Sequence, residues 1–229
     1  MSQAATPSDV ASVYLQHGPY GQGHDPHGHG HVEARGHGAG GPAPKRVIVG
    51  YGFWIFLLSD IVMFSAFFAA YAVLVHQTAG GPTGKQLFDM KRVGLETAFL
   101  LASSFTCGLG YVAATMRKQI QTQFWMLITG LLGLAFVILE VAEFYEMVQN
   151  GAGPSRSAFL SAFFALVGCH GLHVTVGGLW LGTMMAQIWA KGFKEHIMRR
   201  LLCFSVFWHA LDIVWVAIFT IVYLIGTLP

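Results

Sequence analysis

The sequence predicts an all-α membrane protein, built as a bundle of five transmembrane helices. The chain of 229 residues is 54% hydrophobic and only 10% charged, whereas about a quarter of the residues of an ordinary soluble domain are charged. Its mean hydropathy is +0.55. The apolar residues form runs longer than the roughly 20 residues that cross a bilayer. These runs lack the alternation of barrel strands, so helices remain as the way to satisfy the backbone in hydrocarbon.

Residues 1–46 are predicted to be a disordered tail on the cytoplasmic side. They are rich in glycine and proline and contain HDPHGHGH at His24–His31. Such a composition buries too little apolar surface to offset the entropy of ordering. The histidines are possible ligands of a transition metal, but their irregular spacing in a glycine-rich segment favours a solvated tail.

The membrane domain is predicted to span residues 47–229. Its five helices are expected at about 47–75, 93–116, 124–148, 158–190 and 201–228. The fourth run is longer than one crossing needs, so this helix is expected to tilt or to project beyond the membrane.

The distribution of basic residues predicts the orientation, because cytoplasmic loops carry an excess of Lys and Arg. With the N-terminus inside, nine basic residues lie in inner segments: Arg35, Lys45, Arg46, Arg117, Lys118, Lys191, Lys194, Arg199 and Arg200. Four lie in outer segments: Lys85, Lys91, Arg92 and Arg156. The N-terminus is therefore expected in the cytoplasm and the C-terminus outside.

Ionisable residues within the apolar runs are the candidate functional groups. They form a predicted buried polar network of Asp60, Glu140, Glu143, His170, His173, His209 and Asp212. A charged side chain at the bilayer centre costs about 2.5–3.5 kcal/mol, so these groups must be paired, protonated or hydrated. Three of the helices carry pairs with i,i+3 spacing, which share one helix face. Glu96, close to the start of its helix, is expected near the outer interface.

Three interpretations of this pattern remain open from spacing alone. The first is a carboxylate–histidine metal site between facing helices. The second is a proton or ion path, and the third is a set of hydrogen bonds that holds the helices together. Glutamates and histidines lie on different helices here, unlike the Glu-x-x-His pattern of di-iron bundles, which counts against the metal site. Haem ligation by one of the histidines is also conceivable, but no CxxCH attachment motif is present.

Several segments, in order along the chain, resemble subunit III of haem–copper terminal oxidases. They are FLLSDIVMFSAFFAAYAVL, GPTGK, EVAEFYE, ALVGCHGLHVTVGGLW and FWHALDIVWVAIFTIVYLIG, and the resemblance covers about residues 47–228. Within the family the chain is most similar to the ubiquinol oxidase branch of the cytochrome bo type. TAGGPTGK, SAFFALVG, the five predicted helices and the histidine-rich tail carry this similarity.

The resemblance implies a non-catalytic subunit of a proton-pumping respiratory oxidase that oxidises ubiquinol and reduces oxygen to water in the bacterial inner membrane. The family's haems and copper lie in catalytic subunit I, so no cofactor, metal or catalytic residue is expected in this chain. Its expected partners are subunit I, the other oxidase subunits and membrane phospholipids. Its expected roles are to stabilise subunit I, to hold lipid and to support proton uptake. A net charge of +2 gives no sign of a nucleic-acid partner.

Two alternatives remain: subunit III of a cytochrome c oxidase and, more remotely, an intramembrane Glu/His metalloenzyme. The resemblance also places a buried acid after a serine on the first helix, here Ser59-Asp60, where many relatives have glutamate. His170 and His173 are expected to pair with Glu140 and Glu143 across the third and fourth helices. His209 and Asp212 are expected to extend this network.

Overall fold

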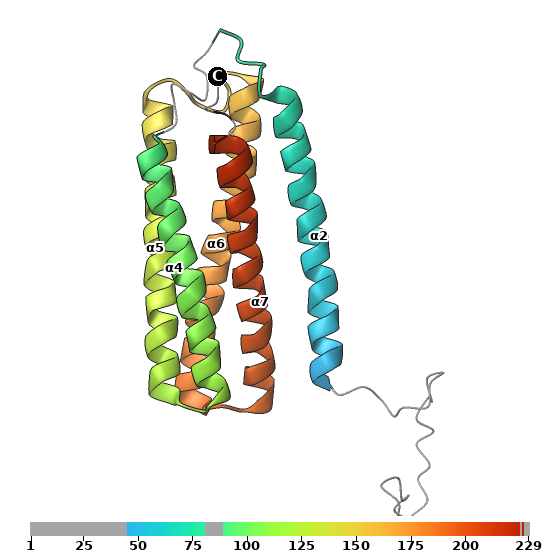
Figure 1. The fold of residues 1–229 in the computed structure, drawn as a ribbon, viewed down its shortest axis with the longest axis vertical. Helices are drawn as coiled ribbons and strands as arrows, with labels where there is room; N and C mark the ends of the chain where they lie inside the picture. The colour runs from blue at the N-terminus through green and yellow to red at the C-terminus, as the bar shows by residue number, and fades with distance from the viewer. Residues whose placement is uncertain (1–44, 81–88, 225, 227–229) are drawn as a thin grey trace, which may run out of the picture. The chain divides into compact units, whose positions relative to one another are not determined.

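Five long helices make up the computed structural model, which describes residues 45–80, 89–224 and 226. They are α2 (Lys45–Leu74), α4 (Met90–Thr115), α5 (Gln119–Gln149), α6 (Ala158–Lys191) and α7 (Glu195–Ile218), and the π-helix η1 (Phe219–Leu224) continues α7 (Figure 1). Each of the five is long and apolar enough to cross a membrane. The predicted fold class is therefore confirmed, while the orientation of the termini stays a prediction.

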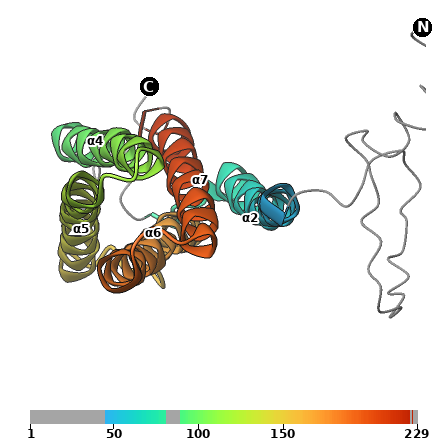
Figure 2. The ribbon, with the colours of Figure 1, turned by 90° about the horizontal axis from the view of Figure 1, so that it is seen from below.

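Residues 43–229 form one compact unit, in which four helices make a closed ring. Helix α4 packs on α5, α5 on α6, α6 on α7, and α7 again on α4. Seen along the bundle, these four lie at the corners of a square, with α2 outside it (Figure 2). Helix α2 packs on α6 and α7, so the interior of the ring is lined by α4–α7 and η1.

Aromatic side chains fill much of this interior. Trp215 is fully buried and meets Phe136 edge-on, with ring centroids 4.6 Å apart. The indole of Trp208 donates a hydrogen bond to the Ser103 hydroxyl on α4 at 3.1 Å. Its ring lies so close to Gly133 on α5 that an added Cβ there would be 2.9 Å from it. Small residues at such points let the helices approach closely, as in other membrane bundles.

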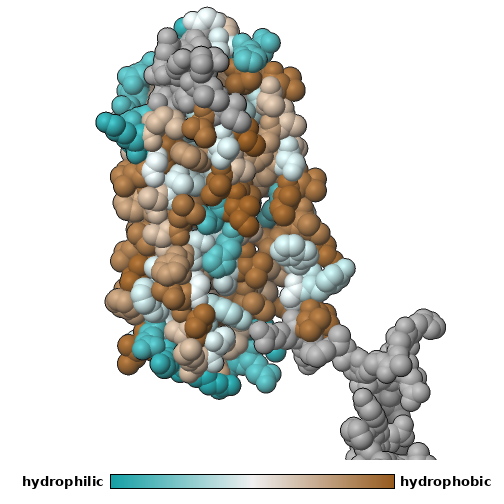
Figure 3. All heavy atoms as spheres, viewed as in Figure 1, coloured by the Kyte–Doolittle hydropathy of each residue, from teal (hydrophilic) through white to brown (hydrophobic). Residues whose placement is uncertain are grey.

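The outer surface of the helical unit is largely apolar. Figure 3 shows a face on which hydrophobic residues predominate, with hydrophilic residues gathered at both ends and a few near the middle. Large side chains with at least half of their surface exposed include Tyr51, Val62, Phe105, Leu131, Ile138 and Leu179. An apolar exterior that surrounds a packed interior fits a protein whose solvent is lipid.

Helices α5 and α7 begin earlier than the apolar runs predicted. Helix α5 begins at Gln119 instead of residue 124: the Gln119 and Gln123 amides donate to the backbone oxygens of Ile188 and Met185 at 3.0 and 2.8 Å. Helix α7 begins at Glu195 instead of residue 201. The predicted tail, apart from residues 45 and 46 at the start of α2, lies outside the described residues, as does the GPTGK loop.

Candidate functional site

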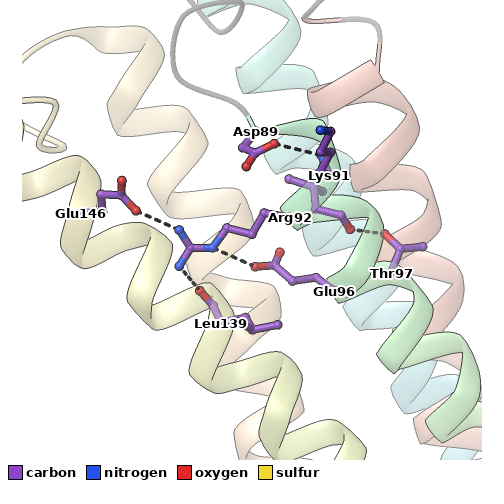
Figure 4. A network of polar contacts seen from close by, with 8 residues as sticks. Asp89, Lys91, Arg92, Glu96, Thr97, Leu139 and Glu146 are labelled. Carbon is purple, nitrogen blue, oxygen red and sulfur yellow. Dashed lines mark hydrogen bonds and ion pairs between the residues drawn. The ribbon is translucent and has the colours of Figure 1, made fainter.

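An arginine near the start of α4 links that helix to α5. Arg92 donates from Nη1 to Glu146 Oε2 at 2.8 Å and from Nη2 to the backbone oxygen of Leu139 at 3.4 Å. Its Nε lies 3.9 Å from Oε1 of Glu96, one helical turn further along α4 (Figure 4). The Glu96 side chain is 0% exposed, whereas that of Glu146 is 66% exposed. Arg92 therefore lies between a buried and an exposed carboxyl group.

Two further carboxyl groups lie beside Glu96 inside the bundle. Glu140 and Glu143 on α5 are 2% and 5% exposed, and both interact electrostatically with Glu96. Both oxygens of Glu96, both of Glu140 and Oε2 of Glu143 have no hydrogen-bond partner in the described part of the chain. Tyr223 of η1 lies beside Glu143. We call Glu96, Glu140 and Glu143 the carboxyl cluster.

The carboxyl cluster extends to α6 at Gly171, against which the Glu140 carboxyl group packs. The preceding residue, His170, is 0% exposed. Its ring stacks on Trp215 with centroids 5.2 Å apart and meets Phe136 edge-on at 5.9 Å. Neither of its ring nitrogens has a hydrogen-bond partner among the described residues. His170 is thus held by aromatic contacts.

His173 bonds to its own helix. Its Nδ1 donates to the backbone oxygen of Cys169 at 2.7 Å, and its ring lies 5.3 Å from that of Phe64 on α2. The direct imidazole–carboxylate hydrogen bonds expected from the sequence are therefore not formed in the described part of the chain. The i,i+3 spacing places His170 and His173 on one side of α6, but they face different neighbours: the aromatic core in one case and α2 in the other.

His209 and Asp212 belong to the interface between α4 and α7. His209 Nδ1 lies 2.6 Å from the Ser104 hydroxyl of α4, and Ser104 also hydrogen-bonds to Asp212. Both residues are half-buried. This group joins α7 to α4, and no hydrogen bond connects it to the carboxyl cluster within the described residues.

Asp60 lies apart from both groups. It is half-buried on α2 and lines a small apolar cavity between α2 and α7, together with Phe64, Phe207 and Leu211. The hydroxyl of the preceding Ser59 donates to the backbone oxygen of Phe56 in its own helix at 2.6 Å. The seven predicted residues are thus spread over several helix interfaces, and whether they act together as one network stays a prediction.

Arg92 was not among the predicted site residues, and the complete burial of the Glu96 side chain between the helices was not predicted either. The place of Glu96 near the outer interface stays a prediction. The available signal was the i,i+4 spacing of Arg92 and Glu96, which puts a cation beside the acid on one helix face. The partners on α5 could not be inferred from that spacing.

The described residues contain no group of three or more His, Cys, Asp or Glu side chains placed to hold a metal ion. The histidines of the tail lie outside the described residues.

Five long apolar helices with ionisable side chains between them define a multi-pass membrane protein. The family model for cytochrome c oxidase subunit III matches residues 32–227. A Pseudomonas aeruginosa protein named cytochrome bo(3) ubiquinol oxidase subunit 3 is 52% identical over 178 residues, which cover 78% of this chain and 85% of that protein. The Pseudomonas putida protein of the same name is 46% identical, over 77% of this chain and 86% of its own length. Quinol oxidase subunit 3 of Bacillus subtilis is 43% identical, over 76% of this chain and 86% of its own length.

The chain belongs to the cytochrome c oxidase subunit III family and is a subunit III of a haem–copper oxidase. The family resemblance drawn from the sequence motifs is thereby confirmed.

Proposed function

We propose that this chain is the non-catalytic subunit III of a proton-pumping ubiquinol oxidase, which reduces oxygen to water in the bacterial inner membrane. The observation that carries the proposal is the 52% identity to a protein named as subunit 3 of a ubiquinol oxidase. The Pseudomonas putida and Bacillus subtilis relatives also carry ubiquinol or quinol oxidase names.

In this proposal the haems and copper lie in the catalytic subunit I, and this chain supplies structural support. The closed ring of α4–α7 suits this role, because its core is packed with aromatic side chains and joined by hydrogen bonds between helices, such as Trp208 to Ser103. Its exposed apolar faces, for example Phe105 on α4 and Leu131 on α5, give area for contact with other oxidase subunits and with lipid.

Helix α2 supports the proposed lipid-holding role. It packs on α6 and α7 outside the ring, and among its described side chains only Leu57, Phe64 and Tyr71 are buried. The cavity between α2 and α7 is lined mainly by Leu57, Ile61, Phe64 and Phe207. An apolar lining of this kind suits contact with the acyl chains of phospholipids. Asp60 lies in the same cavity, and we propose that it supports the packing of α2 without itself carrying protons during turnover.

Comparison of electron donors in the purified complex tests the assignment. We expect rapid oxygen consumption with ubiquinol and little with reduced cytochrome c, in a complex whose subunits include this chain. Rapid oxidation of reduced cytochrome c without oxidation of quinol would instead make the chain a subunit III of a cytochrome c oxidase.

A further inference from the structure

The carboxyl cluster contains more acidic groups than the structure pairs with cations or with hydrogen-bond donors. Glu96, Glu140 and Glu143 are between 0% and 5% exposed. Five of their six carboxyl oxygens have no hydrogen-bond partner among the described residues. Buried polar atoms in proteins nearly always have a partner, either from the protein or from an ordered water. These oxygens therefore require water, a bound proton, or both.

The balance of charges around the carboxyl cluster also indicates that its carboxyl groups bind protons. Among the residues that the structure describes, Arg92 is the cation that pairs with this region, and it forms its short contact, at 2.8 Å, with the exposed Glu146. Its distance to Glu96 is 3.9 Å, which is beyond a hydrogen bond. One guanidinium cannot balance Glu146 and three buried carboxylates together. Since unpaired buried charge is strongly unfavourable, carboxyl groups of the cluster must carry protons.

The groups that surround the cluster come from every element packed against it. They are Asp89 at the N-cap of α4, Arg92 on α4, Glu146 on α5 and Tyr223 on η1, while α6 contributes Gly171 with the neighbouring His170. Glu140 and Glu143 also interact with each other and with Glu96. The three carboxyl groups are therefore coupled, so a proton that binds to one changes the charge felt by the other two.

The cluster lies close to an aqueous end of the bundle. In Figure 4 the Glu96 side chain extends from α4 toward α5 and faces Arg92, which in turn faces Glu146. The Arg92 side chain is 25% exposed and that of Glu146 is 66% exposed. The Arg92 side chain therefore lies between the buried carboxyl cluster and the exposed surface.

We propose that Glu96, Glu140 and Glu143 form a proton-binding site inside the bundle, hydrated by internal water, which exchanges protons with the aqueous phase past Arg92 and Glu146. The site is separate from Asp60, which lies between α2 and α7. It does not depend on which electron donor the oxidase uses. Its ligands are protons and water, and no redox step is involved.

Infrared spectroscopy of the purified oxidase complex tests this site directly, because protonated and ionised carboxyl groups absorb at different frequencies. We expect a carboxylic-acid C=O band at neutral pH that is lost in at least one of the variants Glu96→Gln, Glu140→Gln and Glu143→Gln. The matched control is Glu195→Gln, since the Glu195 side chain is 93% exposed, and it should leave the band unchanged. If none of the three variants removes or shifts such a band, the proposal is overturned.

A second variant keeps the test decisive if a glutamine variant does not assemble. Glu140→Asp retains the carboxyl group, so it should shift the C=O band where Glu140→Gln would remove it; an unshifted band would exclude Glu140 as a proton carrier.

The exchange route has its own measurement. Transfer of the complex to D₂O should shift the band, and Arg92→Gln should change the rate of that shift severalfold. A band that never exchanges, or an unaltered rate in Arg92→Gln, would contradict the route past Arg92.

Discussion

The carboxyl group of Glu140 on α5 occupies the space that a side chain at Gly171 on α6 would fill. An added Cβ at Gly171 would lie 2.6 Å from Oε1 and 2.7 Å from Cδ of Glu140. The acid can be buried at this interface because the facing helix has a glycine there. This one contact couples the packing of α5 and α6 to the position of the carboxyl cluster.

Gly171→Ala should therefore destabilise the subunit. The new methyl group must displace the Glu140 carboxyl group or separate the helices, and overpacking of this kind costs about 1–3 kcal/mol. The effect is measured by heating the complex and determining the temperature at which this subunit is no longer retained in it. Gly178→Ala is the matched control, because nothing lies within 4 Å of a Cβ added there on the same helix. Equal effects of the two substitutions would show that the Glu140 contact is unimportant.

Removal of the Arg92 guanidinium should also destabilise the subunit. Arg92→Gln removes the cation nearest to the buried Glu96 and the hydrogen bonds to Glu146 and Leu139. Loss of such a charged partner costs about 1–3 kcal/mol. Arg199→Gln is the control, because Arg199 pairs at 3.8 Å with the exposed Glu195 and exposed pairs contribute little.

The double variant Arg92→Gln/Glu96→Gln should recover part of the stability, since the second substitution removes the buried acid. No recovery would mean that Arg92 acts only through its contacts with α5.

Asp60→Asn should leave assembly and oxygen reduction nearly unchanged. Asparagine keeps the size and polarity of the side chain, and Asp60 lies in a cavity away from the carboxyl cluster. The decisive quantity is the number of protons ejected per electron in reconstituted vesicles. A large drop with normal subunit content would show that Asp60 itself transfers protons during turnover.

The positive-inside pattern predicts a cytoplasmic N-terminus and an external C-terminus. Single cysteines introduced in the N-terminal tail and at Thr227, in a chain whose native cysteines are replaced, should differ in their reaction with a membrane-impermeant reagent in intact spheroplasts. Only Thr227→Cys should react. Labelling of the tail from outside would reverse the predicted orientation.

The sequence predicted the helices well, because apolar runs of this length have few other stable forms in lipid. It predicted the helix ends less well. Gln119 and Gln123 read as a polar connection, yet they continue α5 because their amides bind backbone oxygens of α6. The contact between α5 and α6 joins segments far apart in the sequence, so the local sequence pattern could not predict this extension of the helix.

The candidate site was predicted in part. Glu140, Glu143 and His170, which the sequence offered as candidates, are buried between helices, but spacing could not tell which helix each would face, and their action as one network stays a prediction. His209 contacts Ser104 on α4 and His170 stacks on Trp215, and neither partner is ionisable. The contacts of Arg92 and Glu96 could not be predicted, because they are made with α5, and the sequence of α4 does not show which helix lies beside it.

The haem and copper content of the complex with and without this chain tests the central claim most directly, which is that the chain supports an oxidase whose redox centres lie elsewhere. The account predicts equal haem and copper per catalytic subunit in the two preparations and similar initial rates of oxygen reduction. It also predicts faster loss of activity without the chain. Loss of a haem or copper from every complex that lacks this chain would contradict the account.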